Sequence, residues 1–260
     1  MRLGVLGWPV AHSRSPAMQH AALQARGLDH WHYGLLPVPP ELLAETVAAL
    51  PGSGFRGANV TIPHKQAALA LSEHATVRAE AIGAANTLTF EPDGMHADNT
   101  DAPALVAALP FSLAGRSALV LGAGGSARAA VWALLDAGAT RVRVWNRTPE
   151  RARELCEAIG GEPVLEAEPA DVLVHCTSTG LGGAGSMFKQ LPLAADELGR
   201  YDCVVDFVYN ERETELISAA RSAGIPFVDG LDLLVGQGAL SFERFTGLAA
   251  PVDVMRAAVR

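Results

Sequence analysis

A glycine-rich turn between an apolar run and a helical pattern constrains the fold of this chain more than any other feature. Residues 119–127 read LVLGAGGSA, which contains the spacing G-x-G-x-x-A. Glycines in that spacing allow a tight turn and the close approach of a pyrophosphate to the backbone, and the last small residue lets strand and helix pack closely. The helix N-terminus then offers amide groups and the positive end of its dipole to phosphates. An ordinary strand–turn–helix is the alternative, but the flanking pattern favours a dinucleotide site.

Short β-rich runs alternate with helical patterns on both sides of this turn, which predicts an α/β fold with parallel sheets covered by helices. Residues 177–192 are rich in Gly, Ser and Thr and are expected to form one long mobile loop. The strands and helices expected after residue 102 are Ala118–Leu121, Ala127–Ala137, Arg141–Trp145, Pro149–Ile159, Val172–Val174, Val204–Val208, Pro226–Val228 and Leu231–Phe245.

The first hundred residues show the same alternation with more polar connections. Ser15 is expected to cap a helix that Pro16 begins, and Pro63 to begin another, because proline suits the first helical position. The turn at residues 92–94, between two β-rich runs, predicts a hairpin. The expected elements are Leu3–Gly7, Pro16–Gly27, Trp31–Leu36, Pro40–Leu50, Gly57–Thr61, a helix from Pro63, Asn86–Phe90 and Met95–Asp98.

Composition excludes several classes of protein. A chain of 260 residues with 49% apolar content can bury roughly three quarters of its unfolded surface, enough for one large or two small domains. A net charge of −8 argues against nucleic-acid binding, and no apolar run reaches the roughly 18 residues of a membrane span. The N-terminal residues enter a strand pattern directly and lack the features of a signal peptide. The expected partners are therefore small molecules, with neither nucleic acid nor membrane.

The cysteines and histidines point to a reducing compartment and away from a zinc centre. Three cysteines, Cys156, Cys176 and Cys203, are odd in number and unpaired in spacing, which favours the cytoplasm. The eight histidines form no zinc-type spacing with them, so no metal is expected. A monomer or a homodimer is expected.

The end of the second strand of the nucleotide unit indicates which cofactor binds. An NAD site usually carries Asp or Glu there, to accept hydrogen bonds from the ribose 2′-hydroxyl. This chain instead has Asn146, Arg147 and Thr148, with Arg151 one turn later. Two guanidinium groups can bind a 2′-phosphate as charge-assisted forks, whereas cations at a helix start gain nothing from its dipole. The pattern favours NADP over NAD.

The rarest residue types of the chain gather in its first half. The chain has 18 arginines but only two lysines, Lys65 and Lys189, with five asparagines and five isoleucines. Six of these twelve rare residues fall within residues 59–99. Lys65 lies where a helix is expected to start, a position that disfavours a cation, and its amine can be tuned to release a proton as a guanidinium cannot. Lys65 is therefore a candidate proton-transfer group, with a surface lysine as the alternative.

A resemblance to a known family covers nearly the whole chain. The chain resembles the shikimate dehydrogenases, NADP-dependent enzymes of the aromatic amino-acid pathway that include the quinate/shikimate dehydrogenases. The motifs that carry the resemblance follow in family order: GWPVAHSRSP at 7–16, NVTIPHK at 59–65, IGAANTL at 82–88, NTD at 99–101, the glycine turn at 122–128, NRT at 146–148, TS at 177–178 and GQGA at 236–239.

The resemblance implies a reaction and a catalytic pair. The reaction is the reversible transfer of hydride between NADPH and C3 of 3-dehydroshikimate, which gives shikimate. A carbonyl that accepts hydride develops alkoxide character and needs a proton donor beside it. By family analogy, Lys65 transfers the proton while Asp101 bonds the reacting hydroxyl and holds the ammonium group. The alternative for Asp101 is a helix N-cap, a common role for Asp.

The resemblance also assigns binding residues. Ser13 and Ser15 are expected on the substrate carboxylate, with Arg14 pointing elsewhere. The ring hydroxyls are assigned to Thr61, Asn86 and Gln237, and Tyr209 is a further candidate that a core position explains almost as well. The cofactor-binding residues are expected to be Gly122, Ala123, Gly124, Gly125, Ser126, Ala127, Asn146, Arg147, Thr148, Arg151, Thr177, Val208, Gly230 and Leu233.

The chain departs from the family pattern at a few positions. His175 and Cys176 stand where Asn-Ala is common, Glu211 replaces the Pro of a Tyr-x-Pro pattern, and Ala104 replaces a Gly. None of these changes removes a predicted catalytic group. His64, beside Lys65, is expected to face outward.

We therefore expect two α/β domains. Residues 1–102 with 237–260 are expected to bind substrate and carry the catalytic groups, and residues 103–236 to form a Rossmann-type NADP-binding domain across a cleft. Two other functions stay open: a quinate/shikimate dehydrogenase that also uses NAD, and a catalytically silent NADP-binding sensor. The Arg147 and Arg151 pair opposes the first, and Lys65 with Asp101 opposes the second.

Overall fold

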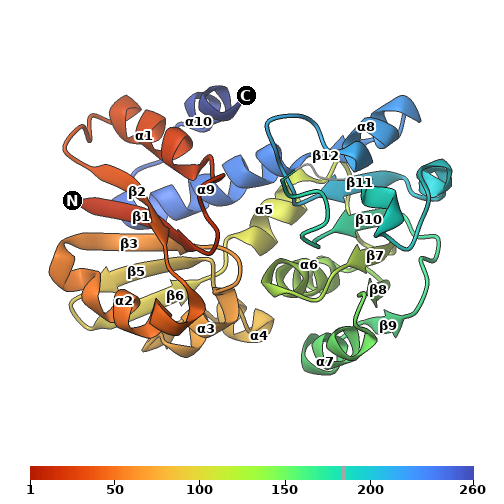
Figure 1. Ribbon diagram of the computed structural model, residues 1–260, viewed down its shortest axis with the longest axis horizontal. Coiled ribbons are helices and arrows are strands. Elements are labelled where there is room, and N and C mark those ends of the chain that lie inside the picture. Colours follow the sequence, from red (N-terminus) through yellow and green to blue (C-terminus); the bar gives the residue numbers. More distant parts are fainter. Residues whose placement is uncertain (183–185) are drawn as a thin grey trace. The chain divides into compact units, whose positions relative to one another are not determined.

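The computed structural model describes residues 1–182 and 186–260 and divides into two compact units (Figure 1). Unit 1 comprises Met1–Ala104 and Leu234–Arg260, and unit 2 comprises Leu105–Leu233. Each unit contains one six-stranded sheet.

The sheet of unit 1 is mixed rather than wholly parallel. Its strand order is β2-β1-β3-β5-β6-β4, with β1 parallel to β2 and β3, and β5 antiparallel to β3 and β6. The predicted hairpin is confirmed, and it explains the mixed sheet, because the two residues between β5 and β6 can only reverse the chain. The strands are β1 (Arg2–Gly7), β2 (His32–Pro37), β3 (Phe55–Val60), β4 (His74–Ala75), β5 (Thr87–Glu91) and β6 (Gly94–Asp98).

Helices cover both faces of this sheet. Leu43 and Val47 of α2 and Ala68 of α3 pack with the side chains of Leu6, Leu88 and other strand residues on one face. On the opposite face, α1 contacts α10, and Phe245 of α9 lies against Gly57, where a Cβ atom would be 2.6 Å from the ring. The helices are α1 (Ser15–Ala25), α2 (Leu43–Ala49), α3 (Lys65–Ala70), α4 (Val77–Ile82), α5 (Asp101–Ala108), α9 (Gly230–Thr246) and α10 (Val252–Val259), with 3-10 turns at Pro40–Leu42 and Pro51–Ser53.

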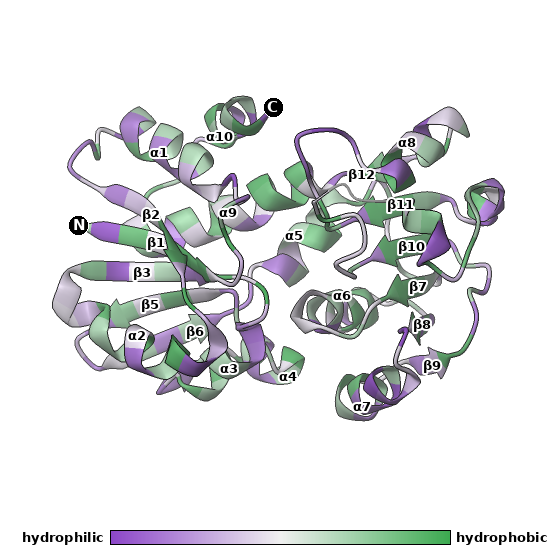
Figure 2. Ribbon diagram, viewed as in Figure 1, coloured by the Kyte–Doolittle hydropathy of each residue, from purple (hydrophilic) through white to green (hydrophobic). Residues whose placement is uncertain are grey.

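Unit 2 contains a wholly parallel sheet in the order β12-β11-β10-β7-β8-β9. Numbered within the unit, this is the 6-5-4-1-2-3 order of a Rossmann fold, in which the strand order reverses between the adjacent first and fourth strands. Figure 2 shows that β7, β10 and β11 are strongly hydrophobic, as expected for strands buried on both faces. The strands are β7 (Ser117–Leu121), β8 (Arg141–Trp145), β9 (Glu162–Val164), β10 (Val172–His175), β11 (Cys203–Asp206) and β12 (Phe227–Val228), with helices α6 (Gly125–Asp136), α7 (Pro149–Ile159) and α8 (Glu215–Ser222).

Three sequence-based expectations about local structure are wrong. Ser15 is the first residue of α1 rather than its cap: the N-cap position is Arg14, which makes no side-chain capping bond, and the hydroxyl of Ser13 accepts from the Ser15 amide. Helix α3 begins at Lys65 rather than Pro63, because residues 61–64 form a turn closed by the His64 amide and the Thr61 carbonyl. The segment 177–192 is interrupted by a 3-10 helix at Met187–Lys189, where the buried Met187 packs in the core of unit 2; residues 183–185 lie outside the described residues.

No helix in the described part of the chain is both long and apolar enough to cross a membrane. The three cysteines are free thiols.

Candidate active site

A buried ion pair lies at one end of the sheet of unit 1. Lys65 Nζ is 2.7 Å from Asp101 Oδ2, and each residue is at most 8% exposed. Lys65 is the first residue of α3, and Asp101 is the first residue of α5, just after β6. A buried charge is expensive unless it is paired, so the sequence-predicted catalytic residues depend on each other for their charged states.

Asn99 frees the Asp101 carboxylate for this contact. The Oδ1 atom of Asn99 accepts from the amides of Asp101 and Ala102, and its Nδ2 donates to the Ala84 carbonyl at 2.9 Å. Asn99 therefore satisfies the amides at the start of α5. The alternative role for Asp101 as the cap of that helix is wrong, because its carboxylate accepts from side chains instead.

Asn86 connects the ion pair to the rest of the site. Its Nδ2 donates to Asp101 Oδ1 at 2.8 Å and lies 3.4 Å from Gln237 Oε1. Its Oδ1 accepts from the amide and hydroxyl of Thr100 and from the hydroxyl of Thr87. These bonds fix which end of the amide faces Asp101, so both carboxylate oxygens have a donor and the carboxylate is held in one orientation.

The other substrate residues predicted in unit 1 follow strand ends of the same sheet. Thr61 follows β3, and its amide donates to the Leu6 carbonyl at 2.8 Å. Gly7 makes room for it, because a Cβ atom there would be 2.5 Å from the Thr61 methyl group. Ser13 and Ser15 follow β1, and Arg14 between them donates to the Val259 carbonyl at 2.6 Å.

His64 faces the interior, so the expectation of an outward-facing side chain is wrong. The residue is 2% exposed, and its Nε2 lies 2.7 Å from the Val38 carbonyl. The turn before α3 directs His64 into the sheet–helix interface, where a carbonyl satisfies the ring.

In unit 2, the glycine turn joins β7 to α6 with geometry that glycine alone tolerates well. Gly122 has φ +119°, and a Cβ atom there would lie 3.1 Å from the Cys176 carbonyl group. Gly124 precedes α6 in extended conformation, and a Cβ atom there would meet nothing within 4 Å. The backbone of this turn is thus open in front of a helix N-terminus, where the first-turn amides have no partner within the helix.

The turn after β8 carries the predicted 2′-phosphate residues. Asn146 Nδ2 donates to the Thr148 carbonyl at 2.9 Å, and Thr148 is the N-cap of α7. Arg147 and Arg151 are both exposed, and among the described residues neither guanidinium makes an ion pair with a carboxylate. Two exposed guanidinium groups beside a β–α turn suit a phosphate monoester.

A buried network that sequence reasoning missed supports Thr177. His175 Nδ1 lies 2.8 Å from Asp206 Oδ1, and His175 Nε2 lies 2.6 Å from Thr177 Oγ1. Asp206 also accepts from the Val208 amide and from the Thr214 hydroxyl. A carboxylate only accepts, so in the neutral ring Nδ1 carries the proton and Thr177 donates to Nε2. The departure from the family pattern at His175 was the available signal, and its partner on β11 was not foreseeable.

The remaining predicted residues of unit 2 lie after β11 and around the start of α9. Val208 is 6% exposed, and Tyr209 follows it with partial exposure. Gly230 begins α9, where a Cβ atom would be 2.5 Å from the Val208 carbonyl oxygen, so these two segments are in direct contact. Leu233 is 4% exposed, one turn into that helix.

Family comparisons agree along the chain. Three family models match in order: the shikimate dehydrogenase substrate binding domain over residues 5–88, shikimate / quinate 5-dehydrogenase over 105–179, and the shikimate 5'-dehydrogenase C-terminal domain over 230–260. The shikimate dehydrogenase (NADP(+)) of Citrifermentans bemidjiense is 42% identical over 98% of this chain and 93% of the relative. The chain belongs to the shikimate dehydrogenase family.

Other members of the shikimate dehydrogenase family support the same conclusion. The Methylobacterium radiotolerans enzyme is 45% identical over 95% of this chain and 91% of the relative. The crystal structure of the Thermus thermophilus enzyme, solved in complex with NADP(H) and shikimate, has a TM-score of 0.89 and 39% identity, covering 100% of this chain and 98% of that one. The Aquifex aeolicus structure has a TM-score of 0.90 at 33% identity, with 100% and 97% covered. The predicted family and α/β class are confirmed.

Proposed function

We propose that the protein is an NADP-dependent shikimate dehydrogenase that reversibly reduces the C3 carbonyl of 3-dehydroshikimate to the hydroxyl of shikimate. The observation that carries the proposal is the buried pair of Lys65 and Asp101, oriented by Asn86 in a chain 42% identical to a named shikimate dehydrogenase. A protein that only sensed NADP would need neither a buried lysine nor the side chains that hold its partner.

Lys65 supplies the proton when the carbonyl becomes an alcohol. Asp101 accepts hydrogen bonds from both Lys65 and Asn86, so its carboxylate acts as an acceptor. Of the two residues, Lys65 is therefore the one that can release a proton and take it back. The pair keeps a charged amine stable in a buried position, and it fixes the direction in which that amine points. In the reverse direction, the same amine takes the proton of the shikimate hydroxyl.

The substrate is bound by hydroxyl and amide groups from unit 1. Ser13 and Ser15 donate to the carboxylate, and Thr61, Asn86 and Gln237 bond the ring hydroxyls, since amides can donate and accept at one site. Tyr209 of unit 2 is a further substrate contact. The contact between the Ser15 amide and the Ser13 hydroxyl supports this assignment, because it holds the two serines beside each other.

The open glycine turn and the guanidinium pair of unit 2 fit an NADP molecule. The pyrophosphate is bound at the turn before α6, by residues 122–127, and the 2′-phosphate by Arg147 and Arg151, beside Asn146 and Thr148. Thr177, Val208, Gly230 and Leu233 complete the cofactor site. When bound, the nicotinamide supplies or accepts the hydride. The absence of Asp or Glu among residues 145–148 supports NADP rather than NAD.

Kinetics of Lys65 variants test the function and the role of the residue together. Wild-type protein should oxidise shikimate with NADP⁺, followed through the absorbance of reduced nicotinamide. Lys65→Ala should lower kcat by about a hundredfold or more, the usual loss for a proton-transfer group. Lys65→Arg keeps the positive charge beside Asp101 but cannot release a proton, so it should fold and be nearly as inactive.

Lys189 offers a matched control, because it is the other lysine of the chain and is exposed. Lys189→Ala should leave kcat unchanged. Activity in wild-type protein with an unchanged kcat in folded Lys65→Ala would exclude the proposed proton transfer, and no activity in wild-type protein would exclude the enzyme function.

We further expect the protein to act in the cytoplasm as a monomer or a homodimer. The three free thiols support a reducing compartment.

A further inference from the structure

We propose that His74, Asp93 and His96 form a binding site for a divalent transition-metal ion, with Zn²⁺ as the best match. The nitrogen and carboxylate atoms that these three residues can offer all lie within 4.8 Å of one another. The cluster belongs to unit 1 and shares no residue with the proposed active site.

Strand pairing fixes the two histidines beside each other. β4 runs parallel to β6, and His74 is the residue directly opposite His96 in that register. The two side chains therefore project from the same face of the sheet, and their ring centroids are 4.5 Å apart at an interplanar angle of 34°. Because both residues are held by sheet hydrogen bonds, little backbone entropy is lost when the rings bind a common ion.

Asp93 brings the third ligand from the tight turn between β5 and β6. Its Oδ1 is 2.9 Å from His96 Nε2, and its Oδ2 is 3.9 Å from His74 Nε2. The Nε2 atoms of both rings thus face one residue, although His74 Nε2 lies closest to the Asp93 main-chain carbonyl oxygen, at 3.2 Å, and must turn from it to bind a metal ion. The turn contains only Pro92 and Asp93 between paired residues Glu91 and Gly94, which keeps the carboxylate close to the two rings.

This set of donors selects the class of metal. Two imidazole nitrogens and one carboxylate suit Zn²⁺, Ni²⁺ or Cu²⁺, whereas Mg²⁺ and Ca²⁺ prefer oxygen atoms alone. Bonds of about 2.0–2.2 Å in a tetrahedron place ligand atoms about 3.4 Å apart. The observed separations bracket that value, so small rotations of the exposed side chains complete the geometry. Water fills the fourth position.

A second acidic side chain lies beside the cluster. Glu73 directly precedes His74 in the chain. Its carboxylate accepts a hydrogen bond from the amide of Met95, the residue before His96, at 2.8 Å. The cluster therefore has a second carboxylate close by in addition to its ligand Asp93.

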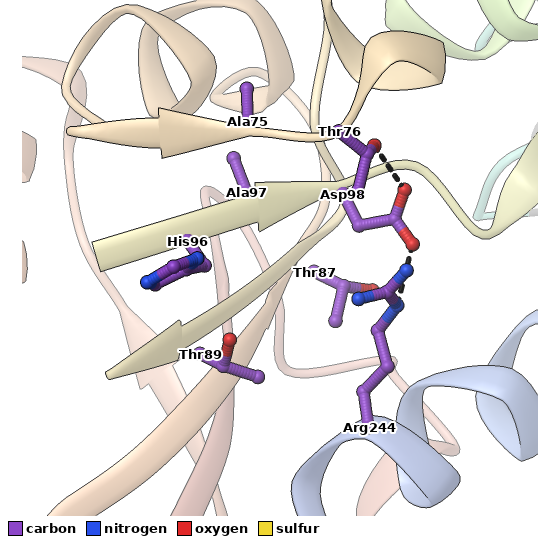
Figure 3. Close-up of a pocket in the computed structure, with 8 residues that line it drawn as sticks. All are labelled: Ala75, Thr76, Thr87, Thr89, His96, Ala97, Asp98 and Arg244. Carbon is purple, nitrogen blue, oxygen red and sulfur yellow. Dashed lines mark hydrogen bonds and ion pairs between the residues drawn. The ribbon is translucent and has the colours of Figure 1, made fainter. Parts of the chain in front are cut away.

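Two guanidinium groups at the other end of β6 are engaged with a carboxylate there. Figure 3 shows Arg244 directed at Asp98, two residues beyond His96 on the same face of β6, and Arg244 Nε is 2.6 Å from the Asp98 carboxylate. Arg78 binds the same carboxylate at 2.7 Å. Both guanidinium groups are thus paired with Asp98, at the end of β6 away from the Asp93 turn. A metal ion at the proposed site would join the two-residue edge strand β4 to the hairpin.

Metal titration of untagged, metal-free protein tests the site. Zn²⁺ added in competition with a chromophoric chelator should bind one ion per chain. His74→Ala, His96→Ala and Asp93→Asn should each weaken binding by about tenfold or more, because each removes one of three ligands. His32→Ala removes an exposed histidine of the same unit that lies outside the cluster, and it should leave the affinity unchanged.

Spectroscopy and stability give independent readouts. Co²⁺ in place of Zn²⁺ should give visible absorbance typical of low coordination number, which the three variants lose. Zn²⁺ should raise the Tm of the wild-type protein and not that of His74→Ala, because a ligand that binds only the folded state stabilises it. The rate of shikimate oxidation should be equal in the wild-type protein and in the three ligand variants. Less than one ion bound per wild-type chain, or equal affinity in His74→Ala and wild type, would overturn the proposal.

Discussion

Asparagine side chains hold the buried polar layer around the Lys65–Asp101 pair. Asn59, Asn86 and Asn99 are each at most 6% exposed. Asn59 accepts from the Tyr33 hydroxyl at 2.8 Å, and its Nδ2 reaches the Asn86 carbonyl. These three residues are among the rare types whose clustering within residues 59–99 is visible in the sequence. Because asparagine is rare in this chain, its clustering drew attention to residues 59–99. Each of the three makes buried hydrogen bonds that an apolar residue could not make.

Asn99→Ala should destabilise the protein. The substitution leaves the Ala84 carbonyl and the amides of Asp101 and Ala102 without their partner in a buried site. Each unsatisfied group costs about 1–3 kcal/mol, so the free energy of unfolding from urea denaturation should fall by at least about 2 kcal/mol. Ser222→Ala removes an exposed hydroxyl that bonds Ser218 and should change it by less than about 0.5 kcal/mol. Similar losses in the two variants would refute this account of Asn99.

Residue-level reasoning from the sequence reached Lys65 and Asp101 but missed their surroundings. Lys65 stood out by composition and by an unfavourable place near a helix start, both local properties. The buried contacts of His64 with Val38, and of His175 with Asp206, join residues 26 and 31 positions apart. Such contacts depend on which strands pair, and no local pattern encodes that.

Elements with strong local end signals were predicted best. The predicted bounds of β8 and α7 agree with the structure, because Pro149 suits the first turn of α7 and Gly160 ends it. Short edge strands were missed: β4 has two residues and β9 three. Their β structure comes from pairing with β6 and β8, which their own sequence does not specify. The proposed metal site could not be predicted from the sequence for the same reason, because the pairing of β4 with β6 brings His74 beside His96.

Substitutions in the turn before α6 should separate backbone strain from cofactor binding. In Gly122→Ala, the new Cβ is placed at a positive φ and 3.1 Å from the Cys176 carbonyl group. The resulting strain should lower both the Tm and the affinity for NADP. Gly124→Ala adds a methyl group that touches no protein atom, so it should leave the Tm unchanged and still weaken NADP binding by occupying the space of the pyrophosphate. Thermal unfolding and fluorescence titration measure the two effects. Full NADP affinity in Gly124→Ala would contradict the proposed position of the phosphates.

At the scale of the whole molecule, two buried thiols make stability depend on pH. Burial raises the pKa of Cys156 and of Cys203 from 9.0 to about 11. The folded chain therefore binds more protons than the unfolded chain between these values, and stability must fall as pH rises through them. Below pH 9 both states hold the thiol protons, so this contribution is constant.

The free energy of unfolding should accordingly decrease between pH 9 and about 11. Urea denaturation at a series of pH values measures the slope. A Cys156→Ala, Cys203→Ala double variant should show a shallower slope over that range, even if its stability is lower throughout. Equal slopes in the two proteins would mean that these thiols titrate as they do in the unfolded chain.

Steady-state kinetics with two substrates and two cofactors test the central claim most directly. Purified protein is given shikimate or quinate with NADP⁺ or NAD⁺, and kcat/KM is measured for each of the four pairs. We predict the highest value for shikimate with NADP⁺, and a lower preference for NADP⁺ over NAD⁺ when Arg147 and Arg151 are both changed to serine. A higher value for quinate or for NAD⁺, or no turnover of any pair, would contradict the account.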